Sequence, residues 1–182
     1  MRKIIVTDFV TLDGVTEAPE KWSFPFWNEE IGKFKQDELF ASDALLLGRV
    51  TYQGFAAAWP SRTDEEGYAD RINSLPKFVV STTLEKVEWN NSRLIKANVA
   101  DEVSRLKQQP GQDIVIHGSG TLVHTLMQHN LIDEHRLLVY PVVLGSGKRL
   151  FKDGSSATLK LVETKAFSSG AVLLRYQPAR SE

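Results

Sequence analysis

Three short runs of mostly apolar residues, each followed within two positions by a glycine or a hydroxyl residue, constrain the fold of this chain more than any other feature. They lie at 44–47, 77–80 and 114–116. Continuous runs of this length are typical of strands buried on both faces of a sheet. Segments of helical character separate them, so strand and helix alternate. That alternation implies right-handed crossovers and a mainly parallel sheet.

Helix signals support this reading. Asn28 precedes two acidic residues, Glu29 and Glu30, as is usual at a helix N-terminus, and that helix should run to about Ala41. Asn98 is expected to cap a second helix that stops at Pro110. Further helices are expected over 49–58, within 60–75 and from the glycines near 120 to about 129.

The two ends of the chain complete the sheet. A β-rich strand over 3–12 ends in the turn dipeptide Asp13-Gly14, and an aromatic-rich loop follows over 15–28. That loop is either a mobile flap over a site or a lid on the core. Strands over 136–143, 158–166 and 171–177 have no helix between them, so an antiparallel extension is expected at one edge of the sheet. We find no linker or repeat and expect one domain over 1–182.

Charge and composition argue against several classes of protein. Lys and Arg number 22 against 23 Asp and Glu, for a net charge of −1, and the signs alternate along the chain. A nucleic-acid-binding surface is therefore not expected. No apolar run approaches the ~20 residues of a membrane span. The absence of cysteine removes disulfides and thiolate metal ligands. We expect a cytoplasmic protein with no metal centre and no membrane partner.

The residues that follow the buried strands are suited to binding an anion, and ligands of open α/β sheets bind at such strand ends. Gly48 allows a tight turn into a helix, Arg49 can make forked hydrogen bonds to a phosphate, and Thr51 adds a hydroxyl. Ser81 and Thr82 follow the next strand. Each motif alone also has an ordinary reading, as a surface arginine, a helix cap or a polar turn.

A glycine-rich turn follows the third strand and opens a helix; its residues are Gly118, Ser119, Gly120, Thr121 and Leu122. Small residues let a pyrophosphate approach a helix N-terminus, but the third glycine of the Rossmann fingerprint is absent. The preceding His117 is expected to be packed or capping. Because all three motifs occupy the same kind of position, together they favour one extended anionic ligand across the strand ends.

A series of motifs spans nearly the whole chain in a fixed order: Thr11-Leu12-Asp13-Gly14, Leu47-Gly48-Arg49-Val50-Thr51-Tyr52, Val80-Ser81-Thr82, Gly118-Ser119-Gly120, Leu131-Ile132-Asp133-Glu134, and Pro141-Val142-Val143-Leu144-Gly145-Ser146-Gly147 with Leu150-Phe151. In this order they resemble the dihydrofolate-reductase-like superfamily, and more closely the reductase (C-terminal) domain of the bifunctional riboflavin-biosynthesis deaminase-reductase and its stand-alone relatives. The resemblance implies an α/β, three-layer fold with a mainly parallel central sheet, an antiparallel C-terminal extension and helices on both faces.

The resemblance also implies NADPH as the cofactor and a homodimer as the assembly. It places one group of residues around the phosphates and the adenosine 2′-phosphate, namely Gly48, Arg49, Thr51, Ser81 and Thr82. It places a second group along the pyrophosphate and the nicotinamide ribose, namely Gly118, Ser119, Gly120, Thr121 and Leu122.

For the substrate, the resemblance points to the first helix and the first strand end. Glu30 would stand where folate enzymes hold the pterin, on the same helix face as Phe34, with its pKa raised by partial burial. The competing reading is a helix-start acid. Asp13 matches an aspartate near the substrate in riboflavin-type reductases, and its competing reading is an Asp-Gly turn. Trp22 of the aromatic loop would complete the substrate side.

The leading hypothesis is a reductase that passes a hydride from NADPH to a small heterocyclic or ribosylated substrate, similar to 5-amino-6-(5-phosphoribosylamino)uracil reductase. Glu30, Asp13 or an ordered water would supply the proton. One alternative is dihydrofolate reductase proper, which Leu75 argues against because it occupies the place of the arginine that clamps the folate tail. The other is a nucleotide-binding module without turnover.

Overall fold

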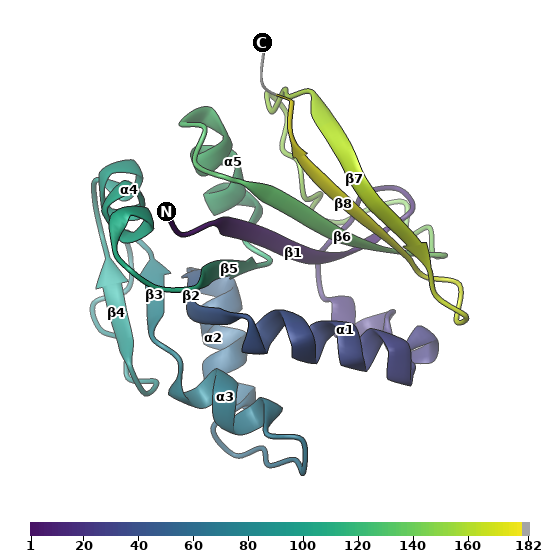
Figure 1. The fold of residues 1–182 in the computed structure, drawn as a ribbon, viewed down its shortest axis with the longest axis horizontal. Helices are drawn as coiled ribbons and strands as arrows, with labels where there is room; N and C mark the ends of the chain where they lie inside the picture. Colours follow the sequence, from purple (N-terminus) through teal and green to yellow (C-terminus); the bar gives the residue numbers. More distant parts are fainter. Residues whose placement is uncertain (180–182) are drawn as a thin grey trace.

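The computed structural model describes residues 1–179 and is built on one eight-stranded sheet (Figure 1). Across the sheet the strands are β4 (Ser92–Ile95), β3 (Lys77–Val80), β2 (Ser42–Gly48), β5 (Asp113–His117), β1 (Ile4–Thr11), β6 (Glu134–Tyr140), β8 (Val172–Pro178) and β7 (Leu159–Ala166). Neighbours from β4 to β6 are parallel, and β8 and β7 are antiparallel. The predicted α/β architecture with its antiparallel C-terminal extension is confirmed.

Helices cover both faces of the sheet and make three layers (Figure 1). Helices α1 (Glu29–Phe40), α2 (Arg49–Ala58) and α3 (Tyr68–Ser74) lie on one face, and α4 (Val99–Gln108) and α5 (Gly120–Gln128) lie on the other. The predicted cap of α1 is confirmed, because the Asn28 side chain accepts the Ile31 N–H at 3.0 Å. No helix within residues 1–179 has both the length and the apolar composition needed to cross a bilayer.

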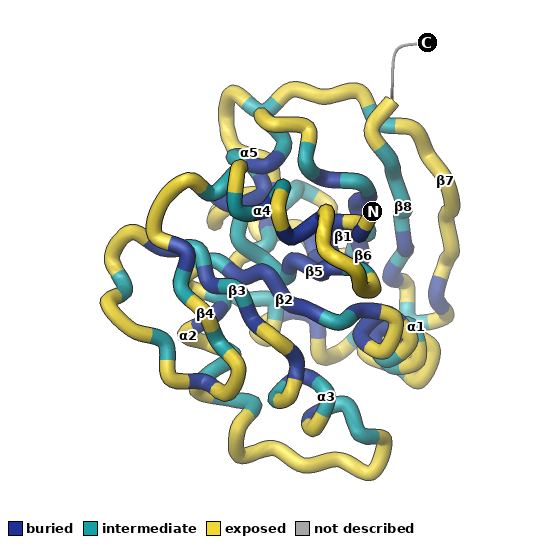
Figure 2. Tube along the Cα trace, turned by 60° about the vertical axis from the view of Figure 1, so that its left-hand side comes forward, coloured by how far each residue is buried: buried dark blue, intermediate teal, exposed yellow. Residues whose placement is uncertain are grey.

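The central strands bury side chains on both faces, as the continuous apolar runs predict. On β2, Leu46 packs against the α4 and α5 layer, while Leu45 and Leu47 pack against α2 and α3. Figure 2 shows this burial as dark blue through β1, β2 and β5, in contrast to the exposed edge strand β7. Removal of this apolar surface from water is the main force that holds the layers together.

The parallel register brings separate loops to one edge of the sheet. Gly48 of β2 pairs with Val80 of β3, and Leu46 pairs with Ile116 of β5. Thr7 of β1 pairs with His117, the last residue of β5. The turns that follow β2, β3 and β5 are therefore neighbours in space, although the sequence separates them widely.

Three sequence predictions need correction. Strand β4 was not expected, because Ser-Arg-Leu-Ile is an edge strand in which only Ile95 is buried. Strand β6 ends at Tyr140 rather than at 143, since Pro141 turns the chain outward and leaves Val143 exposed. Asn98 does precede α4, but it adopts a left-handed conformation (φ 56°) and its side chain makes no capping bond.

A fully buried lysine locks the α3–β3 junction. Lys77 Nζ donates to the carbonyl oxygens of Asn73 (2.7 Å), Leu75 (2.9 Å) and Asn90 (2.9 Å). It also lies 4.2 Å from the centre of the Trp89 ring, a cation–π distance. The lysine therefore joins α3 to the β3–β4 loop and supplies a donor to three carbonyl oxygens in a buried place.

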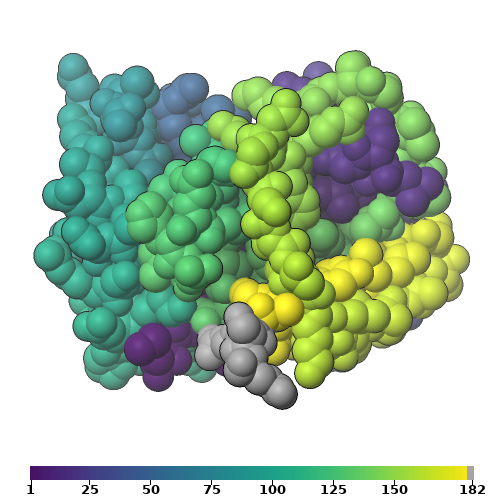
Figure 3. All heavy atoms as spheres, turned by 90° about the horizontal axis from the view of Figure 1, so that it is seen from above, coloured from purple at the N-terminus to yellow at the C-terminus, as the bar shows by residue number. Residues whose placement is uncertain are grey.

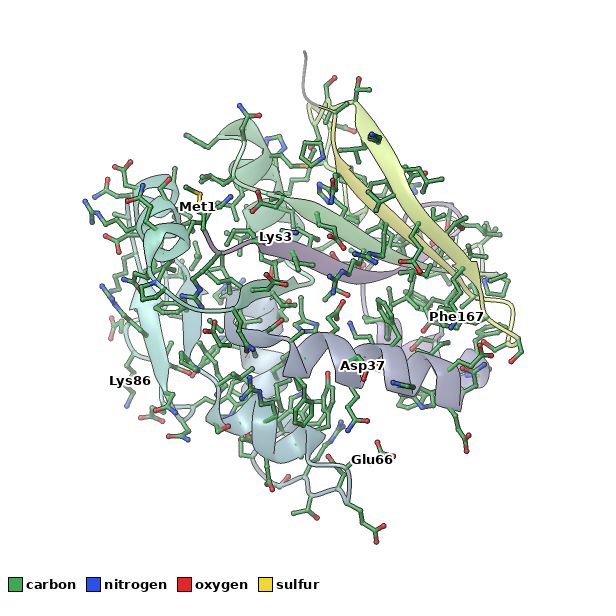
Figure 4. The ribbon with its side chains drawn as sticks, viewed as in Figure 1. Met1, Lys3, Asp37, Glu66, Lys86 and Phe167 are labelled. Carbon is green, nitrogen blue, oxygen red and sulfur yellow. The ribbon has the colours of Figure 1, made fainter. Side chains whose placement is uncertain are left out.

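We predict that Lys77→Met lowers the free energy of unfolding by about 2–4 kcal/mol, because three carbonyl oxygens lose their donor. Urea denaturation measures this. Lys86→Met is the matched control: Lys86 is exposed and points away from the fold (Figure 4), so its loss should cost less than about 0.5 kcal/mol. Equal effects of the two changes would contradict the role given to Lys77.

Candidate functional site

The N-termini of α2 and α5 meet at the carboxyl edge of the sheet. The Gly48 N–H donates to Ser119 Oγ at 2.8 Å, and the same oxygen lies 3.3 Å from Thr51 Oγ1. Gly118, between β5 and α5, lies against Thr51. We call these four residues, Gly48, Thr51, Gly118 and Ser119, the clasp. It brings two of the three predicted anion-binding motifs together.

Glycine is required at two positions of the clasp. A Cβ atom on Gly48 would lie 2.7 Å from Ser119 Oγ, and one on Gly118 would lie 2.6 Å from Thr51 Oγ1. Gly118 also has a positive φ of 61°, and Ser119 follows with φ 64°, which is uncommon for a residue other than glycine. Strained backbone of this kind concentrates at functional sites.

The clasp is suited to an anion. Helix N-termini carry partial positive charge and unpaired N–H groups, and here two of them are held side by side. Arg49 is the first residue of α2; it is exposed, and its guanidinium donates to Gln53 at 3.1 Å. Thr121 is exposed in the first turn of α5, whereas the Leu122 side chain is buried in the core, so only its backbone is available there.

The third motif lies next to the clasp. Ser81 directly follows Val80, which pairs with Gly48, so the register places Ser81 beside the clasp. Its hydroxyl accepts the N–H groups of Thr83 and Leu84, as in a polar turn, and Thr82 is exposed. Lys96 follows the neighbouring strand β4 and is exposed at the same edge. The sequence analysis missed Lys96 because it missed β4.

A buried carboxyl lies beneath the clasp. Asp8 of β1 is 5% exposed, and its Oδ1 accepts the Gly118 N–H at 2.7 Å. Burial raises the pKa of this carboxyl well above its ordinary value, and the bond from Gly118 opposes that rise. The sequence analysis missed Asp8. The available signal was a charged residue inside an otherwise apolar strand.

Glu30, in the first turn of α1, lies against the tip of the β7–β8 hairpin and away from the clasp. Its carboxylate is exposed and accepts the Ser168 O–H at 2.9 Å and the Ser168 N–H at 3.3 Å. These bonds lower the pKa of Glu30, so the predicted rise is wrong. Phe34 packs edge-on against Phe167 of the same hairpin, with ring centres 6.5 Å apart. Both residues anchor α1 to the hairpin.

Asp13 ties two loops together at the end of β1. Its carboxylate accepts the Thr11 O–H at 2.5 Å, the Leu144 N–H at 3.3 Å and the Gly145 N–H at 2.8 Å. The Thr11 bond is the main cause of a pKa lowered to about 2. Arg149 donates to the Asp13 carbonyl oxygen as well. The carboxylate is therefore ionised and already engaged by the chain.

Trp22 forms part of a lid on the core. It is buried, its Nε1–H donates to the Glu17 carbonyl at 3.0 Å, and its ring lies 5.5 Å from that of Tyr140. It also lines a small cavity between two loops, with Val15, Glu17, Ala18, Lys21, Leu144 and Ser146. Of the predicted substrate residues, Trp22 lines this cavity and Asp13 binds the N–H of Leu144, another lining residue, whereas Glu30 and Phe34 lie at the hairpin.

Other features of the molecule have structural explanations. His117 packs against Phe55 with ring centres 5.5 Å apart, and burial lowers the pKa of His117 to about 3, so the packed interpretation is confirmed.

A larger hollow lies between α2, α3 and the β3–β4 loop. Trp89 lines it and hydrogen-bonds to Asn73 and Tyr52, and no predicted site residue lines it. Within residues 1–179, no three acidic, histidine or cysteine side chains gather as metal ligands would.

The segment after β6 covers the second helix of the clasp. The Leu150 carbonyl oxygen would lie 3.2 Å from a Cβ on Gly120, the first residue of α5. On the face covered by α4 and α5, the chain around residue 150 (lime) runs beside α5 (green) in Figure 3. His124 of α5 and Ser155 of that segment hydrogen-bond at 2.7 Å. The start of α5 is therefore held from two sides.

Strand order, layers and the clasp together define a dihydrofolate-reductase-like α/β protein. Dihydrofolate reductase from Enterococcus faecalis, solved with NADP(H) and RAB-propyl, matches with a TM-score of 0.65 and 15% identity over 98% of this chain and 97% of that chain. Within this class, the model of the RibD C-terminal domain family matches residues 2–173. The chain belongs to that family.

Two further relatives agree with the family. The uncharacterized protein YyaP of Bacillus subtilis (strain 168) is 35% identical over 180 residues, which is 96% of this chain and 94% of YyaP. A protein from Shewanella sp. PV-4 that its name assigns to riboflavin biosynthesis has a TM-score of 0.78 and 22% identity, over 98% of this chain and 99% of that chain. The latter likeness is one of fold.

We predict that Gly48→Ala lowers the free energy of unfolding by about 1–3 kcal/mol, because its methyl group would push Ser119 away from α2. Gly54→Ala is the control within the same helix. A Cβ there meets nothing within 4 Å, so alanine should add about 0.5–1 kcal/mol of stability. Urea denaturation measures the free energy of unfolding of both variants. A stabilised Gly48→Ala variant would contradict the close contact between Gly48 and Ser119.

Proposed function

We propose that this chain is an NADPH-dependent reductase that acts on a small heterocyclic or ribosylated substrate. The observation that carries the proposal is the clasp, in which two helix N-termini are held together at the ligand-binding edge of the sheet. Membership of the RibD C-terminal domain family supports it. So does the binding of NADP(H) by the Enterococcus faecalis reductase, which shares the fold.

The residues at this edge fit a dinucleotide. Gly48 and Gly118 let the two helix starts approach each other closely, because a Cβ on either would collide with Ser119 or Thr51. We assign the pyrophosphate and the nicotinamide ribose to the start of α5, namely Gly118, Ser119, Gly120, Thr121 and the backbone of Leu122. We assign the adenosine side and its 2′-phosphate to Gly48, Arg49, Thr51, Ser81 and Thr82, and add Lys96 from β4.

When bound, NADPH supplies a hydride from its nicotinamide ring. The chain's own part is to position the reactants and exclude water. Trp22 and Asp13 would bound the substrate side, with Glu30 and Phe34 at the adjoining hairpin. Asp13 and Glu30 have lowered pKa values and ionised carboxylates, which cannot donate a proton at neutral pH. Of the three proton sources considered, we therefore favour an ordered water.

Folate reduction is the less favoured activity. Leu75, at the position expected for the tail-binding arginine, is 3% exposed and packs in the core against Ile72 and Val79. It offers no donor to a tail carboxylate. For the substrate we propose instead the class that RibD-type reductases take, of which 5-amino-6-(5-phosphoribosylamino)uracil is the example.

For the assembly we propose a homodimer formed through the β7 edge. Strand β7 is the outermost strand, and it exposes Leu161 and Val162 by nearly half of their surface. An edge strand presents unpaired backbone N–H and C=O groups, which can pair with a strand of another chain.

Fluorescence titration with NADPH and NADH tests the proposed function. We predict that Arg49→Ala weakens NADPH binding by about 10–100-fold and NADH binding by less than about 3-fold, because only NADPH carries the 2′-phosphate that the guanidinium would hold.

Arg62→Ala is the matched control, since Arg62 is an exposed arginine that stacks 4.8 Å from the Trp59 ring beyond the far end of α2. Its loss should leave both affinities unchanged. Equal losses for both cofactors in Arg49→Ala would overturn the 2′-phosphate assignment. Failure of the wild type to bind either cofactor at micromolar concentration would overturn the reductase.

A further inference from the structure

Asp8 is an unusual residue for its place in the fold. It lies in the interior of β1, between Thr7 and Phe9, on a central strand that is buried along nearly all its length. Beside it on the same face of the sheet is an apolar cluster of Val10, Leu137 and Leu150. A carboxyl group in such surroundings loses most of its hydration, which is costly unless its oxygens find partners.

Only half of that carboxyl group is satisfied. Oδ1 accepts the Gly118 N–H at 2.7 Å. Oδ2 is buried and has no hydrogen-bond partner among residues 1–179. A buried oxygen without a partner lowers the stability of the fold, and an apolar side chain at this position would avoid that cost. What aspartate offers and an apolar residue lacks is an acceptor for the Gly118 N–H.

That bond acts at the start of the clasp. Because Thr7 pairs with His117, the Asp8 carboxyl lies directly beside the peptide that leaves β5. Gly118 and Ser119 then adopt two successive left-handed conformations, and this path directs the Ser119 hydroxyl to the Gly48 N–H. Without an acceptor, the Gly118 N–H would be unpaired, and the loop would gain conformations that separate Ser119 from α2.

We propose that Asp8 is a positioning residue of the cofactor site: by accepting the Gly118 N–H it holds the Gly118–Ser119 turn in the conformation that closes the clasp. The effect on cofactor affinity rests on the proposed function. The effect on the turn itself does not, and it can be measured in the absence of any ligand.

The test compares Asp8→Leu, which removes the acceptor, with Asp8→Asn, which keeps an acceptor oxygen. Amide hydrogen exchange across residues 117–122 is measured without ligand, and the NADPH dissociation constant is measured by fluorescence. Asp8→Leu should speed exchange of the Gly118 amide by at least about 10-fold and weaken NADPH binding by about 10-fold, as expected for the loss of one hydrogen bond. Asp8→Asn should stay within about 3-fold of wild type in both.

Asp133→Ala is the matched control. Asp133 Oδ2 also accepts a backbone N–H, that of Ile4 at 2.8 Å, and it pairs with Lys107 at 2.7 Å. Ile4 begins β1, so this carboxyl lies at the amino edge of the parallel sheet, opposite the clasp. Its loss should speed exchange near Ile4 and leave both the Gly118 amide and the NADPH affinity unchanged.

Three outcomes would overturn the proposal. The first is that Asp8→Leu has the wild-type Gly118 exchange rate and the wild-type NADPH affinity, and the second is that Asp8→Asn departs from wild type as far as Asp8→Leu does. The third is that Asp133→Ala loses as much NADPH affinity as Asp8→Leu. If the wild type binds no NADPH, the proposed function fails and the exchange data alone decide on Asp8. If Asp8→Leu does not fold, the exchange rate of the Gly118 amide in the wild-type protein is the test. Slow exchange of this amide supports the proposal, and exchange as fast as that of the exposed Thr82 amide overturns it.

Discussion

The hydrogen bond from the Gly48 N–H to Ser119 Oγ joins segments 71 residues apart, and the candidate site depends on it. The bond is possible only because β2 and β5 are parallel neighbours that end at the same edge of the sheet. It also requires glycine on both sides, since a methyl group at 48 or 118 would collide with Ser119 or Thr51. The arrangement of the clasp therefore depends jointly on the sheet register, on the placement of glycine and on two helix N-termini.

The two sides of the site differ in how they are built. The proposed cofactor side consists of helix starts, exposed Arg49 and hydroxyl groups at the edge of the sheet. On the proposed substrate side, Asp13 and Glu30 are engaged with backbone groups of C-terminal loops, and Trp22 packs on the core. Because neither Asp13 nor Glu30 is buried, their hydrogen bonds lower their pKa values, and the same bonds hold the loops in place. The residues that we expect to contact the substrate therefore also anchor the loops around it.

Local sequence patterns predicted the features that local physics controls. Continuous apolar runs marked β2, β3 and β5, and the glycine and hydroxyl residues after them marked the clasp. The features that were missed depend on distant contacts. Glu30 owes its lowered pKa to Ser168, 138 residues away, and Asp8 owes its role to Gly118, 110 residues away. Strand β4 is defined by pairing with β3 rather than by its own composition, so Lys96 could not be placed from the sequence.

If the starts of α2 and α5 form a single site for one cofactor, both should respond to the same ligand. Titration of the ¹⁵N-labelled wild-type protein with NADPH, followed by two-dimensional NMR, measures this response. We expect the amide signals of residues 48–51 and 118–121 to shift together with one dissociation constant. Shifts confined to one of the two helix starts, or to the hollow between α2, α3 and the β3–β4 loop, would contradict a single site.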